Sequence, residues 1–268
     1  MKRIMILFTV LVLSIFVFTG CQGGDDKTIT VGATPSPHAE ILVVAKDVMA
    51  EQGYTLKIRE FTDYILPNTA LDDGEIDANY FQHQLYLDDF NVKNGTKLVT
   101  IASIHYEPMA IYPGKTASID ELKDGAIISV PNDPTNEARA LLLLEAAGLI
   151  KVDPNAGLQA TVRDITDNPK NLTIEEIEAA QVTRTLGDVD MAVVNGNYAL
   201  LAGLNVENDA QFIEEKDSLA ATSYVNVLAV REGNEDNEAL KALADALQSE
   251  EVKQFIEETY AGSVVPMF

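Results

Sequence analysis

Positive charge is scarce in this sequence. Only 19 of its 268 residues are Lys or Arg, against 42 Asp and Glu, so the formal net charge is −23. Nucleic acids and anionic membrane surfaces attract basic patches, so this charge argues against both as partners. Gly and Pro are not enriched and 47% of residues are hydrophobic, which argues against disorder and provides a buried core. The length suits one large or two modest domains.

Cysteine and histidine are also rare. The single cysteine, Cys21, excludes an intramolecular disulfide and a zinc site built on several cysteines. The three histidines, His38, His83 and His105, do not form the HExxH pattern, and the sequence contains neither a Gly-rich phosphate loop nor a GxSxG elbow. A metal site that joins His83 to His105 and Glu107 is an alternative that no spacing fixes. We therefore expect no catalytic residue, no metal and no cofactor, and a protein that is not an enzyme.

The first 20 residues are typical of a secretory signal peptide. Lys2 and Arg3 precede the uncharged apolar run Ile4–Phe18. This run is shorter than the roughly 20 apolar residues that a transmembrane helix needs. Its end, Phe18-Thr19-Gly20-Cys21, resembles a bacterial lipobox, in which the cysteine carries the lipid.

The lone cysteine therefore predicts a membrane anchor. After cleavage, residues 21–27 are a short polar tether. An ordinary signal peptide with an incidental free thiol is the alternative, but an exposed thiol would be a liability in an exported protein. We expect an extracytoplasmic protein that is held on the cell membrane through lipidated Cys21.

From residue 28 onward, β-rich runs alternate with helical periodicity. This pattern predicts an α/β fold with mostly parallel sheets flanked by helices, and no long linker divides the chain. We expect strands over residues 28–33, 54–61, 76–79, 97–102, 126–130, 190–194 and 224–231, and helices over residues 38–52, 135–147, 174–186, 237–247 and 250–260.

A short pattern occurs twice, about 110 residues apart. Gly74-Glu75-Ile76-Asp77 and Gly187-Asp188-Val189-Asp190 both follow an expected helix and precede an apolar strand. The pattern is also common as a simple turn between a helix and a strand, so it does not by itself establish a repeat. It favours two lobes of similar build.

Extended segments at residues 105–112 and 224–231 would suit crossings between these lobes. Two α/β lobes with a ligand in the cleft between them form a periplasmic-binding-protein-like fold. We expect lobe 1 to comprise residues 28–108 and 227–268, and lobe 2 residues 109–226. We expect the two crossover strands to join them in a monomer.

Residues 131–139 (PNDPTNEAR) connect an apolar strand to a helix. Asn136 and Arg139 share one face of its first turn, where free N–H groups and the helix dipole favour an anion. The Arg139 guanidinium can hold a carboxylate through two N–H groups, and such turns are where open α/β sheets bind ligands. The alternative is an ordinary surface ion pair of Arg139 with Glu137 or Glu145.

Aromatic residues gather in the first half of the chain. Tyr64 lies just beyond an expected strand, and Phe81 and His83 are expected at the start of the helix that follows the 76–79 strand, with Tyr86 three residues later. Aromatics with a few polar groups suit an apolar ligand side chain and contact thioether sulfur favourably. From spacing alone, core packing is the favoured explanation for Phe81 and Tyr86.

Two isolated asparagines complete the candidates. Asn195 follows the expected strand 190–194, and Asn226 lies in the extended segment 224–231. Neutral amides at such positions could bind an ammonium or a carboxylate without adding charge.

The sequence resembles the NlpA/MetQ family of methionine-binding lipoproteins, which deliver substrate to an ABC importer. Ser36 stands where the family commonly has glycine and Leu85 where it often has proline, but neither is a candidate ligand residue. The matching runs extend in order along nearly the whole mature chain: residues 31–42, 61–71, 77–87, 131–150, 168–172, 194–199 and 224–226.

The resemblance implies a function and a set of ligand residues. It implies an extracytoplasmic lipoprotein that captures methionine and presents it to a membrane permease. A relative tuned to another apolar amino acid or to a methionine-containing dipeptide, or an adhesin that reuses the fold, are the alternatives. It assigns the ligand's backbone groups to Asn136 and Arg139, further polar contacts to Asn195 and Asn226, and the thioether pocket to Tyr64, Phe81, His83 and Tyr86.

Overall fold

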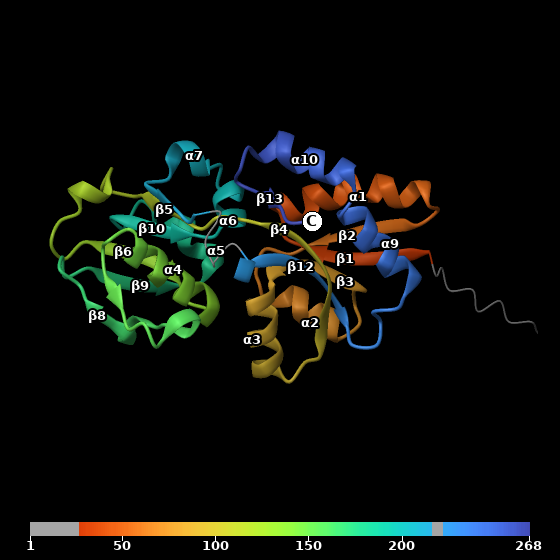
Figure 1. Cartoon of the computed structure of the whole chain (residues 1–268), viewed down its shortest axis with the longest axis horizontal. Helices are drawn as coiled ribbons and strands as arrows, with labels where there is room; N and C mark the ends of the chain where they lie inside the picture. Colours follow the sequence, from red (N-terminus) through yellow and green to blue (C-terminus); the bar gives the residue numbers. More distant parts are fainter. Residues whose placement is uncertain (1–26, 216–221) are drawn as a thin grey trace, which may run out of the picture.

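The computed structural model describes residues 27–215 and 222–268. The expected signal peptide, Cys21 and all of the tether except Lys27 lie outside these residues. Within them, no helix has both the length and the apolar character needed to cross a membrane. Two α/β lobes lie side by side, one built on a six-stranded sheet and the other on a five-stranded sheet (Figure 1).

The first lobe is a mixed sheet covered by helices on both faces. Helices α1, α9 and α10 cover one face, while α2 and α3 cover the other (Figure 1). Strands β2, β1 and β3 run parallel, whereas β12 is antiparallel to both of its neighbours. The sheet order is β13 (Val265–Pro266), β4 (Leu98–Tyr106), β12 (Val225–Arg231), β3 (Ala78–His83), β1 (Thr28–Ala33) and β2 (Thr55–Glu60), and the helices are α1 (Glu40–Glu51), α2 (Leu66–Asp72), α3 (Gln84–Asn94), α9 (Glu238–Leu247) and α10 (Glu250–Tyr260).

The second lobe repeats this layered build with a smaller sheet. Helix α4 (Pro134–Ala146) packs its leucines against one face, and short helices cover the other. The sheet order is β11 (Phe212–Ile213), β5 (Ala110–Pro113), β10 (Met191–Val194), β6 (Ile127–Pro131) and β9 (Thr173–Ile177), the short helices are α5 (Ala179–Val182), α6 (Gly196–Leu201) and α7 (Val206–Asp209), and β7 (Lys151–Val152) pairs with β8 (Ile165–Asp167).

The predicted α/β class is confirmed, with sheets that are mixed rather than mostly parallel. Strands β1, β2 and β3 are parallel, as are β10, β6 and β9, but every other paired strand in the described residues runs antiparallel. In each sheet a strand next to a connection between the sheets runs against both of its neighbours. Such strands are β12 between β3 and β4 in the first sheet, and β5 between β10 and β11 in the second.

Two local predictions are wrong. The helix expected over 174–186 is instead strand β9 followed by the short helix α5, because the Thr173–Ile177 backbone completes the edge of the second sheet by pairing with β6. Tertiary pairing here overrides the helix preference of its glutamates. Phe81 and His83 lie in β3, whose six residues are all buried, and not in the following helix. Helix α3 starts at Gln84, with His83 as its N-cap.

Side-chain caps explain why several helices begin where the sequence predicts. Asn237 caps α9 by accepting the main-chain N–H groups of residues 239 and 240, and Ser249 caps α10 in the same way. Asp133 caps α4, and Pro134 occupies the first helical position, where its missing N–H costs nothing. This last start places Asn136 and Arg139 on the first turns of α4.

Each connection between the sheets is short or partly outside the described residues. Residues 107–109 connect β4 to β5, and residues 214–224 connect β11 to β12. Strand β12 belongs wholly to the first sheet, where Val225 and Asn226 pair with Tyr106 and His105. The expected boundary between residues 226 and 227 therefore falls inside one strand.

The repeated tetrapeptide makes the same contacts in both lobes. Asp77 donates its main-chain N–H to the carbonyl of Thr30 and accepts the Thr30 N–H on its carboxylate, each at 2.8 Å. Asp190 does the same to Ile127, at 2.9 and 2.8 Å. In each lobe the aspartate thus ties the start of one parallel strand to its neighbour, which explains why the motif recurs.

We predict that Asp190→Ala lowers the free energy of unfolding by about 1–2 kcal/mol, because the Ile127 N–H loses its charge-assisted acceptor. That N–H also holds the pKa of Asp190 below its ordinary value, so the stabilisation is present above about pH 4 and disappears as the pH falls further. Urea unfolding at pH 7 measures the difference. The exposed Asp188→Ala is the matched control, and equal stability of the two variants would contradict the prediction.

Candidate functional site

A cavity lies between the two lobes. The space between its lining atoms, counting the open space at its mouth, is about 340 Å³. Side chains from β3 and α3 of the first lobe face side chains from α4 and the end of β10 in the second. All eight residues proposed from the sequence line it: Tyr64, Phe81, His83, Tyr86, Asn136, Arg139, Asn195 and Asn226.

Asn136 is oriented by the residue that caps its own helix. Its Nδ2 donates to both carboxylate oxygens of Asp133, at 2.9 and 3.0 Å. An ionised carboxylate only accepts hydrogen bonds, so the amide group must face Asp133. The Oδ1 atom of Asn136 is therefore turned toward the cavity, where it serves as an acceptor for two neighbours.

His83 is one of these neighbours, and its tautomer follows from its contacts. The Nδ1 atom accepts the main-chain N–H of Tyr86 at 3.1 Å, so it carries no proton. The proton lies on Nε2, which donates to Asn136 Oδ1 at 3.2 Å across the two lobes. Burial lowers the pKa of His83 to about 3, with Arg139 adding to the shift, so the ring is neutral at pH 7.

Asn195 is the second neighbour and carries an acceptor without a partner. Its Nδ2 donates to Asn136 Oδ1 at 2.7 Å, which fixes the orientation of the amide. The Asn195 side chain is buried, yet its Oδ1 has no hydrogen-bond partner among the described residues. Leaving a buried acceptor unpaired costs free energy, so this oxygen is suited to a donor that a ligand would bring.

Arg139 lies on the same helix as Asn136 and is almost fully buried, with 4% of it exposed. It does not pair with Glu137 or Glu145, whose carboxylates accept the main-chain N–H groups of Val162 and Val152. Its partner is Glu214, 75 residues further along the chain. The alternative of a solvated surface pair is therefore wrong.

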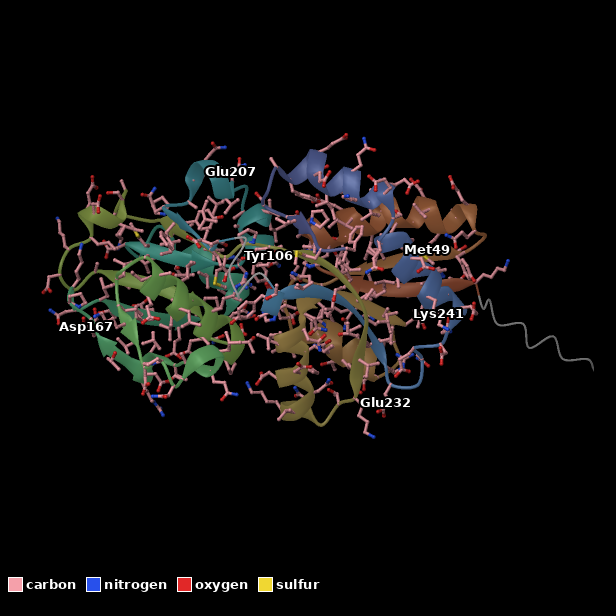
Figure 2. All side chains as sticks on the ribbon, viewed as in Figure 1. Met49, Tyr106, Asp167, Glu207, Glu232 and Lys241 are labelled. Atoms are coloured by element: carbon pink, nitrogen blue, oxygen red, sulfur yellow. The ribbon has the colours of Figure 1, made fainter. Side chains whose placement is uncertain are left out.

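The surroundings of Arg139 keep it charged. Burial disfavours the charged form, but Glu214 more than compensates for this, and the net effect raises the pKa of the guanidinium above its ordinary value. The guanidinium also lies 4.3 Å from the centre of the Tyr224 ring and 5.6 Å from that of Tyr106. Tyr106 is labelled near the middle of Figure 2, where the two lobes meet.

Tyr64, Phe81 and Tyr86 form an aromatic wall at the cavity, and Tyr198 packs against Tyr64. The Tyr64 ring is 5.9 Å from Phe81, 5.6 Å from Tyr86 and 5.0 Å from Tyr198, measured between ring centres. The Tyr64 hydroxyl donates to Asn197 Oδ1 in the second lobe. Phe81 and Tyr86 are thus buried and at the same time line the cavity, so core packing and pocket formation coincide.

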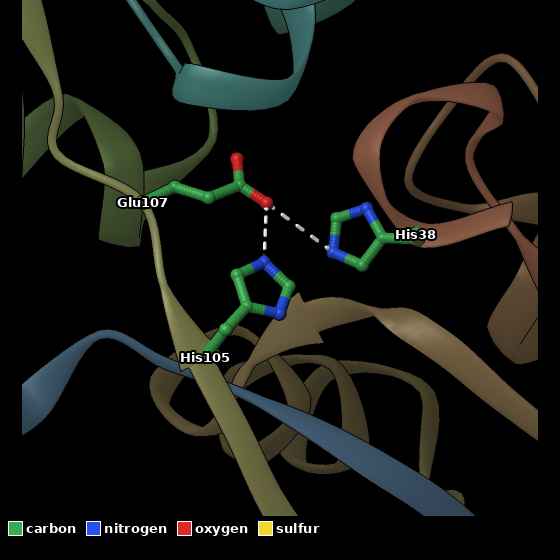
Figure 3. A group of neighbouring side chains, drawn as sticks. All are labelled: His38, His105 and Glu107. Carbon is green, nitrogen blue, oxygen red and sulfur yellow. Dashed lines mark hydrogen bonds and ion pairs between the residues drawn. The ribbon is translucent and has the colours of Figure 1, made fainter. Parts of the chain in front are cut away.

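A carboxylate and two histidines meet next to this cavity. His38 and His105 both point to Glu107, which lies in the connection from β4 to β5 (Figure 3). The Nε2 atoms lie 3.4 and 2.7 Å from Glu107 Oε1. The Nδ1 atoms face the hydroxyls of Thr34 and Tyr80, which complete the network.

The two histidines of this cluster are neutral members of a hydrogen-bonded network. Burial lowers the pKa of His38 to about 4 and of His105 to about 3, so both rings are neutral at pH 7. Hydroxyl donation to each Nδ1 leaves each Nε2 proton for an acceptor. The three side chains are also a donor set that could hold a metal ion, with ligand atoms within 4.8 Å of one another. His83, which the sequence suggested as a third member, is not part of it.

Asn226 is joined to the same network. Its Oδ1 lies 3.0 Å from His38 Nε2 and accepts that N–H. The Nδ2 group is then the part of the amide that remains to donate to a ligand at the cavity.

Sequence reasoning missed several residues of the cavity. Gly196 is required there, because a Cβ at this position would lie 2.7 Å from Glu107 Cβ. The two neighbouring asparagines and the glycine between them, at the end of the second repeat unit, were a usable signal. The other missed lining residues are His38, Gln82, Glu107 and Asn197.

A cavity that combines a buried guanidinium, oriented amides and an aromatic wall between two α/β lobes defines a two-lobed small-molecule-binding protein. The chain belongs to the NlpA lipoprotein family, whose profile matches residues 29–268. The resemblance noted from the sequence is thereby confirmed. The family is one of binding lipoproteins and not of enzymes.

Similar proteins cover nearly the whole chain. The D-methionine-binding lipoprotein MetQ of Salmonella typhimurium is 44% identical over 252 residues, which are 92% of this chain and 91% of the relative. A solved Ruminococcus gnavus protein described as a lipoprotein is 53% identical, with a TM-score of 0.89 over 90% of this chain and 100% of its own. A Burkholderia cenocepacia nutrient-binding protein, solved bound to methionine, is 45% identical, with a TM-score of 0.85 and the same two coverages.

We predict that acid destabilises the protein partly through His83. Unfolded histidine takes up a proton near pH 6.5, whereas folded His83 does so only near pH 3. The free energy of unfolding therefore falls as the pH drops from 6.5 toward 4, by up to about 1.4 kcal/mol per pH unit for this residue. His83→Gln removes that part of the slope.

Urea unfolding at pH 7, 6, 5 and 4 tests this. His38 and His105 contribute in the same direction, whereas Glu107 and Asp133, whose pKa values burial raises, oppose them. All four groups are present in both the wild type and His83→Gln, so the difference between their pH slopes reports on His83 alone. An unchanged slope in the variant would show that the ring is not held neutral.

Proposed function

We propose that this chain captures methionine in the cavity between its lobes and delivers it to an ABC import permease. We further propose that it acts outside the cytoplasm, as a monomer held on the cell membrane by lipidated Cys21. The observation that carries the proposal is the unpartnered Asn195 Oδ1, which lines the same cavity as the Arg139 guanidinium and the aromatic wall.

These three features match the three parts of an apolar amino acid. The ligand ammonium would donate to Asn195 Oδ1, whose orientation the contacts of Asn136 fix. The ligand carboxylate would accept from Arg139 and from the Asn226 amide. The thioether would lie against Tyr64 and the other aromatic rings, which contact sulfur favourably. The ligand named for the Salmonella and Burkholderia proteins supports methionine.

The interlobe contacts support closure over the ligand. His83 bonds to Asn136 and Tyr64 to Asn197, so residues that line the cavity also join the lobes. We propose that the lobes separate to admit methionine, with residues 107–109 as a hinge. Closure would remove water from the Arg139 site and strengthen its contact with the ligand carboxylate.

We predict that Arg139→Ala lowers methionine affinity at least tenfold, because a charge-assisted contact contributes about 1.5–3 kcal/mol. Isothermal titration calorimetry measures this. Arg139→Lys keeps the charge without the planar fork, and we expect it to bind methionine weakly as well. Exposed Arg163→Ala, also in the second lobe, is the matched control. Unchanged methionine binding by Arg139→Ala that remains folded would refute the assignment.

We predict that Cys21→Ser releases the protein from the membrane fraction, because serine offers no thiol for the lipid. Labelling with an alkyne fatty acid followed by fractionation measures both lipidation and location. The purified variant should bind methionine like the wild type, since all the side chains that line the cavity, from His38 to Asn226, are unchanged. Continued labelling and membrane retention of the variant would contradict lipidation at this residue.

A further inference from the structure

Glu214 has no role in the function proposed above, yet its carboxylate is buried and accepts hydrogen bonds from several residues. It follows β11 directly, at the start of the connection to β12, and only 7% of it is exposed. A buried charge is costly unless it is paired and hydrogen-bonded, so its partners indicate what it does.

The carboxylate accepts from groups on three separate segments. Arg139 Nε lies 3.1 and 3.2 Å from its two oxygens, and Arg139 Nη2 also donates to Oε2. The Tyr106 hydroxyl donates from the end of β4, and the Met109 N–H donates at 3.2 Å from the connection between β4 and β5. Burial raises the pKa of Glu214, but Arg139 and these hydrogen bonds outweigh it and hold the pKa below its ordinary value. The group is therefore ionised and fixed.

These contacts define the orientation of Arg139. Glu214 occupies the edge of the guanidinium formed by Nε and Nη2, and the main-chain oxygen of Glu107 accepts from Nη2 at 2.8 Å. The guanidinium is planar and its donors form a rigid fork, so fixing one edge fixes the direction of the remaining Nη1 group. Arg139 lines the cavity, so this group is the one left for a ligand.

We propose that Glu214 is a positioning residue for recognition of the ligand carboxylate, because it holds one edge of Arg139 and thereby directs the other into the cavity. This inference rests on the proposed function, in which Arg139 binds that carboxylate. Glu214 acts through Arg139 and does not contact the ligand itself. It does not line the cavity.

A purely electrostatic role of Glu214 predicts the opposite effect on methionine affinity from a positioning role. If Glu214 only neutralised Arg139, its negative charge would repel the ligand carboxylate, and removing the charge would tighten methionine binding. A purely structural role would weaken every ligand alike. Positioning weakens only ligands that carry a carboxylate. Comparing methionine with methioninol, in which an alcohol replaces the carboxylate, separates the three.

Calorimetry of Glu214→Gln with both ligands is the test. We expect methionine affinity to fall about tenfold, while methioninol affinity changes less than threefold, so the preference for methionine shrinks. Tyr106→Phe removes one hydroxyl donor to Glu214 with almost no change in shape, and we expect a smaller shift in the same direction. If Glu214→Gln does not fold, the comparison of the two ligands is made with Tyr106→Phe instead. Glu215→Gln removes an adjacent exposed charge, and we expect it to leave both affinities unchanged.

The outcomes distinguish this inference from the proposed function. If the wild type binds neither ligand, or binds them equally, the proposed carboxylate site itself fails. If the wild type prefers methionine but the variants weaken both ligands equally, Glu214 is only structural and the inference is overturned. Tighter methionine binding by Glu214→Gln would overturn it in favour of charge neutralisation.

Discussion

The buried ion pair between Arg139 and Glu214 is the contact on which the arrangement of the lobes and the cavity both depend. Each charge is shielded from water, so either one alone would be strongly destabilising. Additional hydrogen bonds to the carboxylate and to one edge of the guanidinium support the pair. Arg139 comes from the second lobe, whereas its other contacts are Tyr106 of the first lobe and the Glu107 carbonyl in one connection. A single guanidinium thus joins both lobes and both connections at the cavity.

The remainder of the cavity is made polar without further fixed charge at its centre. Asp133 orients Asn136, Asn136 orients Asn195, and each step uses the fact that a carboxylate or carbonyl oxygen can only accept. The histidines take part as neutral rings, because burial keeps their pKa values well below 6.5. Apart from the Arg139 guanidinium and the Glu107 carboxyl group, this cavity therefore offers a ligand hydrogen bonds of fixed direction.

Local patterns predicted the parts of this structure that local forces decide. Asp133 and the proline after it fix the start of α4, and the repeated Gly-x-x-Asp pattern fixes two strand starts. Family resemblance supported the eight candidate residues that line the cavity, but not Gly196 and the other lining residues that the sequence analysis missed. The sequence did not reveal contacts between residues that are distant along the chain. Glu214, for example, lies 75 residues from Arg139, and no sequence pattern links the two. The helix prediction for residues 174–186 was wrong for the same reason, because the edge strand β9 is stabilised by pairing with its neighbour β6 and not by its own sequence.

The order of strands in the first sheet has a consequence for synthesis and folding. Strand β12 lies between β3 and β4, although the whole second sheet separates it from them along the chain. Until residue 231 has emerged, β3 and β4 have no strand between them and their facing edges remain unpaired. The second sheet is continuous in sequence and can form earlier. The first lobe must therefore close last, through contacts of high sequence separation that form slowly.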